Sequence, residues 1–400
     1  MTVSTEHQFT EIYRNRDFYV PAFDIKINGK DLPNYASKDV IDVRYTDSID
    51  RIDSFEITVN NWDAKGQDFK YTGSTKGTLT ERDQLFDPKR QRSIELWMGY
   101  FKPSRGLPSE QSTGLQLMLM GLITRITPNF PTNGQPTLKV SGQNFLRNLM
   151  TRQETHTYER KRDSEIAEQV GRRGNLRIGN LVIPVRIDPQ AKNQEPENEH
   201  VIQDNQYDIV FLLQRAHKNG YDLVLRGEGK EQHLFFGPSL QNSRSSYILE
   251  WGKSLIQFQP SITVASQVYS VTVNGWNAAQ GKRISVTVDR SDLPPSDRGP
   301  RDSSKLNDIE EGFRERQEVI ADMPFRNKAE AKQYALSLLS NNARELITGQ
   351  GSTIGTPGLR AGRSIDIRGL GKTFSGLYTV KSTTHTINAS GYITEFEVSL

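Results

Sequence analysis

The sequence predicts a β-rich α+β protein in which one chain carries two antiparallel β-barrels with a small α+β insertion between them. Near the end of the chain, Tyr392, Thr394, Phe396 and Val398 alternate with polar residues. This period of two is typical of a half-buried antiparallel strand. Four similar sequence segments occur twice in the same order. The first set is residues 57–63, 92–96, 121–124 and 137–141, and the second set is 271–277, 363–367, 376–379 and 392–400. The spacing is unequal, which indicates a duplicated domain with different loops and not a solenoid.

Composition sets the limits of this prediction. The 400 residues provide room for two or three domains, and the 25% charged and 34% hydrophobic fractions are those of a soluble protein. No segment has the roughly 20 apolar residues of a membrane span, and the polar residues 1–10 lack an apolar signal segment. We therefore expect synthesis and retention in the cytoplasm. With no cysteine, the fold must be held by packing, and the net charge of +3 argues against a protein devoted to nucleic acid.

Residues 1–20 are interpreted as an N-terminal arm, and residues 21–150 as the first barrel. A strand over 23–27 ends at Asn28-Gly29, a strong hairpin signal. Further strands are predicted over 40–45 and 53–60. Trp62 and its counterpart Trp276 are expected to plug one end of each barrel core.

Two polar segments of the first barrel, residues 63–92 and 101–114, are predicted to be long loops at its rim. Loops of this length are usually functional or disordered. Residues 115–127 return to strand, and Leu138 and Val140 close the barrel.

Residues 141–150 become helical and lead into the α+β insertion domain, residues 151–246. Asp163 and Asp208 are each predicted to be the N-cap of a helix. The apolar positions expected to face the core are Ile166, Ala167 and Val170 in the first helix, and Ile209, Leu212, Leu213 and Ala216 in the second. Gly220 ends the second helix, and strands over 221–226 and 233–236 follow.

Residues 247–400 are interpreted as the second barrel, interrupted by an inserted loop and helix at 291–345. The polar stretch 291–318 is predicted to be exposed or disordered. Asn327 is the expected N-cap of the helix, with Glu330 three residues later. The apolar face of that helix is Ala331, Tyr334, Ala335, Leu338 and Leu339.

No catalytic, cofactor-binding or metal-binding residues are assigned, and an enzyme is not predicted. The histidines lack metal-ligand spacing; they are His7, His156, His200, His217, His233 and His385. Of these, His385 is expected to be structural or to lie at an interface. The glycines of 349–355 follow a helix and lack the Gly-Lys-Ser/Thr ending of a phosphate loop, and 72–77 fails the same test. A carboxylate pair formed only in space remains open.

Basic residues cluster at 89–92, 160–162 and 172–173. Solvated surface is the default interpretation. The alternative is that they bind an acidic neighbouring subunit or line a channel. Because no aromatic residues are interleaved with them, specific nucleic-acid readout is not expected.

Together these segments resemble the baseplate hub proteins of contractile phage tails and related injection systems, namely the phage late control protein D group and the hub part of VgrG-type spikes. The resemblance covers residues 19–400. Its motifs, in chain order, are residues 53–56 followed by 61–63, residues 205–208 followed by 219–221, and then 271–276, 357–362, 376–380, His385 and 391–396.

The resemblance implies two tail-tube-like barrels per chain and a homotrimer that forms a pseudo-sixfold ring. Such a ring would join a hexameric tail tube above to a trimeric spike below. The expected partners are the tube protein, the spike and other baseplate components, in a particle assembled in the bacterial cytoplasm. Because 392–400 forms the closing strand and no needle sequence follows it, the spike is expected to be a separate protein.

A rival hypothesis is a tail-associated cell-wall hydrolase or glycan-binding protein. A lytic activity would need its own cleft with a paired acid. Residues 151–246 are the only candidate for that block, and no distinctive acid pair stands there.

Overall fold

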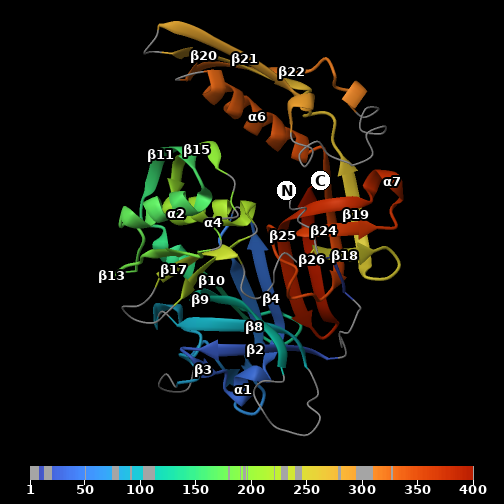
Figure 1. Ribbon diagram of the computed structural model, residues 1–400. Coiled ribbons are helices and arrows are strands. Elements are labelled where there is room, and N and C mark those ends of the chain that lie inside the picture. The colour runs from blue at the N-terminus through green and yellow to red at the C-terminus, as the bar shows by residue number, and fades with distance from the viewer. Residues whose placement is uncertain are drawn as a thin grey trace.

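The computed structural model describes residues 9–12, 20–49, 51–73, 81–90, 92–101, 113–178, 181–189, 191, 195, 197–219, 221–226, 233–238, 246–277, 281–293, 310–325 and 328–399. A 14-stranded sheet forms its centre, and smaller sheets with helices lie beside it (Figure 1). The predicted β-rich fold, with two barrel-like antiparallel halves and an α+β insertion, is confirmed.

The first half of the large sheet contains seven strands, and each is antiparallel to its neighbours. In spatial order they are β4 (Val40–Ser48), β5 (Ser54–Asn60), β10 (Thr137–Asn144), β9 (Thr113–Asn129), β8 (Ser93–Phe101), β2 (Pro21–Ile27) and β3 (Lys30–Asp31). Asn28 and Gly29 join β2 to β3 with φ values of 51° and 74°, the positive pair that a type I′ hairpin turn requires. The short helix α1 (Asn34–Ser37) follows.

The second half also contains seven strands: β1 (Phe9–Glu11), β18 (Ser246–Glu250), β24 (Ser364–Arg368), β25 (Gly376–Asn388), β26 (Gly391–Ser399), β23 (Ile347–Ile354) and β19 (Leu255–Ile262). The arm strand β1 pairs in parallel with β18, and Ile12 beyond it is buried in the core of this half. In β26, Tyr392, Thr394, Phe396 and Val398 are buried, as the alternation predicts. The short helix α7 (Gly371–Phe374) precedes β25.

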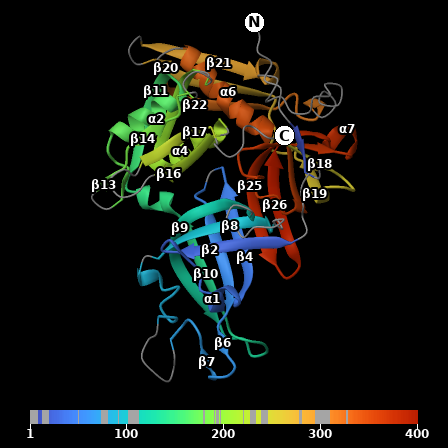
Figure 2. The ribbon, with the colours of Figure 1, turned by 60° about the horizontal axis from the view of Figure 1, so that its bottom comes forward.

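The two halves form one continuous sheet. Strand β25 pairs with β24 and β26 of its own half, and beyond them with β4 of the first half. The antiparallel register between halves runs from Ser382 opposite Ser48 to Ile387 opposite Val43. In Figures 1 and 2 the C-terminal hairpin lies against the N-terminal strands.

Strand order confirms the duplication. The series β8-β9-β10-β5-β4 in the first half corresponds to β24-β25-β26-β23-β19 in the second. Three of the four predicted sequence matches fall on equivalent strands. The fourth is wrong, because residues 57–63 run through β5 of the large sheet whereas 271–277 belong to β20 (Ser270–Asn277) of a separate sheet. The strand equivalent to β5 is β23.

The prediction that two tryptophans plug the barrel cores is also wrong. Trp276 is 54% exposed. Trp62 is half-buried and packs edge-on against Phe69 in the hairpin β6 (Trp62–Asp63) and β7 (Asp68–Phe69), which projects from the first half in Figure 2. The Trp62 indole therefore packs on a local hairpin, the Trp276 indole is exposed, and neither ring fills a barrel core.

The segment 63–92, predicted to be a long polar loop, contains some secondary structure and two buried aromatic residues. It contains the β6–β7 hairpin and a 3-10 turn, η1 (Pro88–Arg90). Tyr71 and Phe86 within it are each 1% exposed and pack edge to face. The segment therefore returns to cover the core. Most of the loop predicted at 101–114 lies outside the described residues.

The insertion between the halves follows a 3-10 turn, η3 (Phe145–Leu149), where the sequence predicted helix. It contains β11 (Gln153–Lys161), α2 (Asp163–Arg172), β12 (Arg177–Ile178), β13 (Leu181–Val182), β14 (Val185–Ile187), β15 (Asn198–Tyr207), α4 (Asp208–Lys218), β16 (Tyr221–Arg226) and β17 (His233–Pro238). Asp163 and Asp208 are the first residues of α2 and α4, but the N-cap of α2 is Arg162, so the predicted cap Asp163 is one residue too late. The predicted apolar residues of both helices are buried. Gly220 lies outside the described residues.

A second α+β unit interrupts the second half between β19 and β23. Strands β21 (Lys282–Asp289), β20 and β22 (Gln317–Pro324) form its sheet, and α6 (Lys328–Arg344) packs on that sheet (Figure 1). A 3-10 turn, η5 (Arg290–Asp292), follows β21. Ala331, Ala335 and Leu339 of α6 are fully buried, as predicted. The predicted cap Asn327 and residues 294–309 lie outside the described residues.

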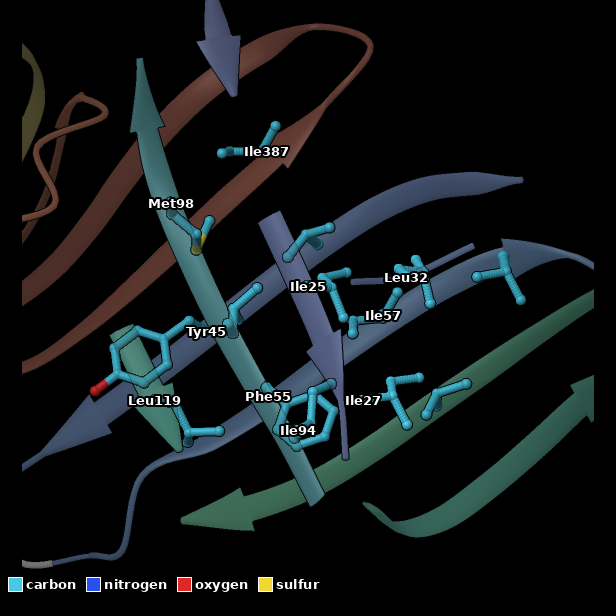
Figure 3. Packing of buried hydrophobic residues seen from close by; sticks show 14 of the residues in the cluster. Ile25, Ile27, Leu32, Tyr45, Phe55, Ile57, Ile94, Met98, Leu119 and Ile387 are labelled. Carbon is cyan, nitrogen blue, oxygen red and sulfur yellow. The ribbon is translucent and has the colours of Figure 1, made fainter. Parts of the chain in front are cut away.

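The core of the first half is completed by the second half. Tyr45, Phe55 and Ile57 pack on residues from β2, β8 and β9, and Ile387 of β25 lies in the same cluster (Figure 3). Tyr392 of β26 belongs to it as well. The two halves therefore share buried apolar surface in addition to a strand ladder.

Candidate functional site

Where the two halves meet, strand β4 places a carboxylate inside the protein. Val43, Tyr45 and Asp47 alternate along the inward face of β4, and Asp47 is 4% exposed. A charge in such a position is costly unless it is paired and hydrogen-bonded. The residues around Asp47 supply those partners from the second half.

The main partner is Arg360, from the segment between β23 and β24. Its Nε lies 2.8 Å from Oδ2 of Asp47, and its Nη2 donates to the carbonyl oxygen of Met118 at 3.1 Å. Nη2 also donates to the hydroxyl of Tyr45, and the guanidinium carbon lies 4.4 Å from the Tyr45 ring centroid. One arginine therefore bridges β4, β9 and the second half.

The other lone pairs of Asp47 are satisfied by the second half too. The backbone N–H of Thr383 donates to Oδ1 at 3.2 Å, and the Thr383 hydroxyl donates to the same oxygen. The N–H of Ala361 donates to Oδ2 at 3.2 Å. The carboxylate consequently fixes β25 and the 357–362 turn against β4 at once.

His385 continues the polar cluster along β25. Its Nε2 lies 2.9 Å from the carbonyl oxygen of Leu359, which can only accept, so Nε2 carries the proton in the neutral ring. Nδ1 then accepts from the hydroxyl of Tyr392 at 3.0 Å or from that of Thr394 at 3.1 Å. The imidazole is fully buried, as expected for a structural residue.

Burial and the ion pair set the charge states of the cluster. Burial alone would raise the pKa of Asp47, but Arg360 and then His385 lower it below its usual value. Burial lowers the pKa of His385 to about 4, with Arg360 adding to that direction and Asp47 opposing it. Burial likewise raises the pKa of Tyr45 and of Tyr392 well above their usual value. At neutral pH the cluster therefore holds one ion pair and a neutral imidazole.

This arrangement holds the halves together and offers little for catalysis. Asp47, His385 and Thr394 are each less than 5% exposed, and their polar atoms are engaged by protein groups. A substrate would have to displace those hydrogen bonds to reach them.

The opposite face of the same strands is open and forms a groove of about 610 Å³. Its lining is polar and includes Arg44, Arg125, Arg147, Thr46, Ser54 and Ser141. The three arginines come from β4, β9 and η3. Within the described part of the chain, none of their side chains makes an ion pair or hydrogen bond.

The predicted basic clusters have other roles. Arg173 is directed inward, with Nη2 2.9 Å from Oδ1 of Asp208 and 3.0 Å from the Gln203 amide oxygen. Arg90 pairs loosely with Asp87 at 3.8 Å. The residues 89–92, 160–162 and 172–173 are absent from the groove lining. Sequence clustering therefore missed the groove arginines, which are single residues on separate strands.

The glycine-rich run at 349–355 is part of a sheet and does not form a phosphate loop. A Cβ at Gly349 would meet the Phe258 ring, and one at Gly351 would meet the Phe396 ring. Glycine is needed there because aromatic rings lie directly over strand β23. The other segment compared with a phosphate loop is 72–77, and its residues 74–77 lie outside the described residues.

Two further features concern the described residues alone. No group of three or more histidine, aspartate or glutamate side chains is placed there to hold a metal ion. No described helix is long and apolar enough to cross a membrane.

Comparison with solved structures places the fold among phage tail proteins. The 43 kDa tail protein of prophage MuSo2 from Shewanella oneidensis superposes with a TM-score of 0.56 at 12% identity, over 94% of this chain and 98% of that one. A tail protein from Neisseria meningitidis MC58 gives a TM-score of 0.57 at 11% identity, over 96% and 97%. No curated protein sequence matches the chain.

The family model described as the Alg8 N-terminal domain matches residues 18–389. The chain belongs to that family. The two superpositions confirm the predicted likeness to tail proteins at the level of the fold, and the finer assignment to baseplate hubs and the late control protein D group stays a prediction.

Proposed function

We propose that this chain is a structural, non-enzymatic baseplate hub of a phage tail or contractile injection particle. In this role it forms a homotrimer whose six barrel-like units make a pseudo-sixfold ring. The ring joins a hexameric tail tube on one side to a separate trimeric spike on the other. The particle would be assembled in the bacterial cytoplasm, and the hub would belong to its baseplate.

The duplicated strand order carries this proposal. Five strands of the first half and five of the second follow the same spatial series, and β4–β25 pairing sets the two copies side by side. A chain with two equivalent units offers six positions as a trimer while keeping threefold symmetry. Such a ring matches a sixfold tube and a threefold spike together.

The full-length likeness to two tail proteins supports the same role, because it extends over the α+β insertion as well as the sheet. In the proposed ring, residues 21–150 and 247–400 are the two tube-like units. Residues 151–246 form the insertion domain between them, and the part of the second unit within 291–345 lies outside the repeated strands.

The outer strand of the second half offers a surface for the next chain. In the described part of the sheet, β19 pairs with β23 on one side, and the turn before it brings Trp251 opposite Leu255. Trp251 is 65% exposed and Ile256 is 56% exposed. Edge strands with large exposed apolar residues commonly mark a site of association.

The mass of the purified protein tests the assembly. We expect light scattering to give three times the chain mass of 45.4 kDa, alone or on addition of the tube protein. Electron-microscopic averages should show threefold symmetry with six barrel-like densities. A stable monomer with no affinity for itself or for tube protein would refute the proposal.

Charge placed on the β19 surface should prevent assembly without unfolding the chain. In the variant Trp251→Glu with Ile256→Glu, two exposed side chains become acidic, so the circular dichroism spectrum should stay unchanged while the trimer is lost. The matched control is Ile202→Glu on β15, where the residue is 46% exposed. That control should remain trimeric.

The rival cell-wall hydrolase is tested by a zymogram on purified peptidoglycan. The buried carboxylates of the insertion are already engaged: Asp163 with Arg215 at 2.5 Å and Asp208 with Arg173 at 2.9 Å. A carboxylate held in this way would have to break its ion pair before it could contact a substrate. A cleared zone would contradict the non-enzymatic role, and a cleared zone that disappears when these aspartates are replaced would also contradict their structural role.

A further inference from the structure

We propose that the arginine groove on the open face of the sheet is a docking site for an acidic polypeptide segment of a partner protein. The groove is the 610 Å³ depression lined by Arg44, Arg125 and Arg147. The groove is formed within a single chain, so binding there does not depend on the trimer proposed above.

The strand register places the charges. Arg44 lies opposite Glu56, Glu56 opposite Ser141, and Ser141 opposite Arg125, so the four residues form one row across β4, β5, β10 and β9. Neighbouring strands are about 4.8 Å apart, which separates the backbones of Arg44 and Arg125 by about 14 Å. Arg147 stands beyond the end of β10, in η3.

A β-bulge at Arg125 contributes to the charge of this face. The register between β10 and β9 shifts between Ser141 and Gly142, so Thr124 and Arg125 are both exposed instead of alternating. The bulge therefore leaves a hydroxyl and a guanidinium on the open side. Bulges commonly re-aim a side chain in this way next to functional sites.

The electrostatics favour an anionic occupant. Among the described residues, the three groove arginines have no ion-pair or hydrogen-bond partner, and Glu56 is already paired with Lys139 at 3.2 Å. Guanidinium groups bind carboxylates by paired, charge-assisted hydrogen bonds. Nearby hydroxyls of Ser54 and Ser141 can donate further hydrogen bonds.

The geometry favours a polypeptide over a nucleic acid. An extended chain rises about 3.4 Å per residue, so carboxylates four residues apart match the 14 Å span. A polypeptide can place a neutral or basic residue over Glu56, whereas a phosphodiester chain would bring negative charge to every position. The aromatic residue of the lining, Phe55, is 1% exposed, so its ring is not available to stack on bases.

Fluorescence polarisation with a labelled glutamine peptide that carries glutamate at every fourth residue tests the proposal on the full chain. We expect binding at low ionic strength that weakens as salt is added, and no binding of an oligoglutamine peptide of the same length. Arg44→Gln and Arg125→Gln should each weaken binding by about tenfold, the effect of one lost charge-assisted hydrogen-bond pair. Glu56→Gln should strengthen it.

The control is Arg283→Gln on β21, which removes the same charge from an exposed site outside the groove. It should leave binding unchanged, and the three arginine variants should keep the wild-type melting temperature because Arg44, Arg125 and Arg283 are exposed. The proposal is overturned if the glutamate-containing peptide does not bind or if Arg283→Gln weakens binding as much as Arg125→Gln. It is also overturned if an oligothymidylate of equal charge binds as tightly, since the site would then read phosphate.

Discussion

Replacement of Asp47 by alanine removes the carboxylate that Arg360, Thr383 and Ala361 share at the boundary between the two halves. The guanidinium of Arg360 then stays in a site where its side chain is only 22% exposed. Removing one partner of a buried ion pair costs about 3–5 kcal/mol, because the other charge is left without compensation. Partial access of water to Arg360 favours the lower end of that range, about 3 kcal/mol.

The matched control is Glu56→Ala on the adjacent strand β5. Its partner Lys139 lies 3.2 Å away, but the two side chains are 39% and 48% exposed. Pairs of this kind contribute about 0–1 kcal/mol. Two carboxylate deletions on neighbouring strands should therefore differ at least threefold in their cost.

The assay is urea unfolding at pH 7, followed by tryptophan fluorescence and far-ultraviolet circular dichroism. A double variant, Asp47→Ala with Arg360→Met, should recover about 1–3 kcal/mol relative to the sum of the single losses, since it leaves no unpaired charge. A loss below about 1 kcal/mol for Asp47→Ala, or strictly additive single and double variants, would show that the ion pair does not hold the halves together.

Three further outcomes are expected. The pKa of His385 is 6.5 in the unfolded chain and about 4 in the folded one, so the unfolded state binds more protons between these pH values. Acidification from pH 6.5 to 4 should therefore remove about 3 kcal/mol of the free energy of unfolding. In urea titrations at several pH values, His385→Gln should abolish this part of the pH dependence. Gly355→Ala brings a Cβ into the ring of Tyr392 and should cost about 1–3 kcal/mol, and an unchanged melting temperature would contradict the packing at that position. Removing residues 395–400 takes the second half of β26 from between β23 and β25, so the product should be insoluble; a soluble trimer that still binds tube and spike would disprove this role of β26.

Local patterns were sufficient to predict the elements whose burial is decided by nearby sequence. The alternation at Tyr392 and Phe396 identified β26, and the helical spacing after Asp163 and Asp208 identified α2 and α4. In these elements one face is buried whatever element packs against it, so the spacing of apolar residues alone is enough to predict the element.

Pairing across the chain was beyond such patterns. The strand that ends at Trp276 was assigned to the second barrel, but it belongs to the small sheet that packs on α6. A strand with alternating apolar and polar residues has the same sequence pattern in either sheet. Arg360 reads as part of a turn, and only its contact with Asp47, 313 residues earlier, reveals its role. The groove arginines are single residues on three elements, so no local cluster indicated them.

The shared core has a consequence for synthesis on the ribosome. Ile387 and Tyr392 belong to the core cluster of the first half, and β25 covers the edge of β4. When residue 144 has emerged, the strands of the first half are present but that edge has no partner. At about 5–20 residues per second, the ribosome needs roughly 10–50 s to deliver the missing strands.

During that interval the nascent chain presents an open strand edge beside incompletely covered apolar side chains. Such surfaces recruit other chains as readily as the correct strand. The late C-terminal hairpin therefore acts as the step that commits the first half to its native pairing. Premature termination before residue 376 should release a chain with β4 uncovered, which is a substrate for chaperones and proteases and not a usable half.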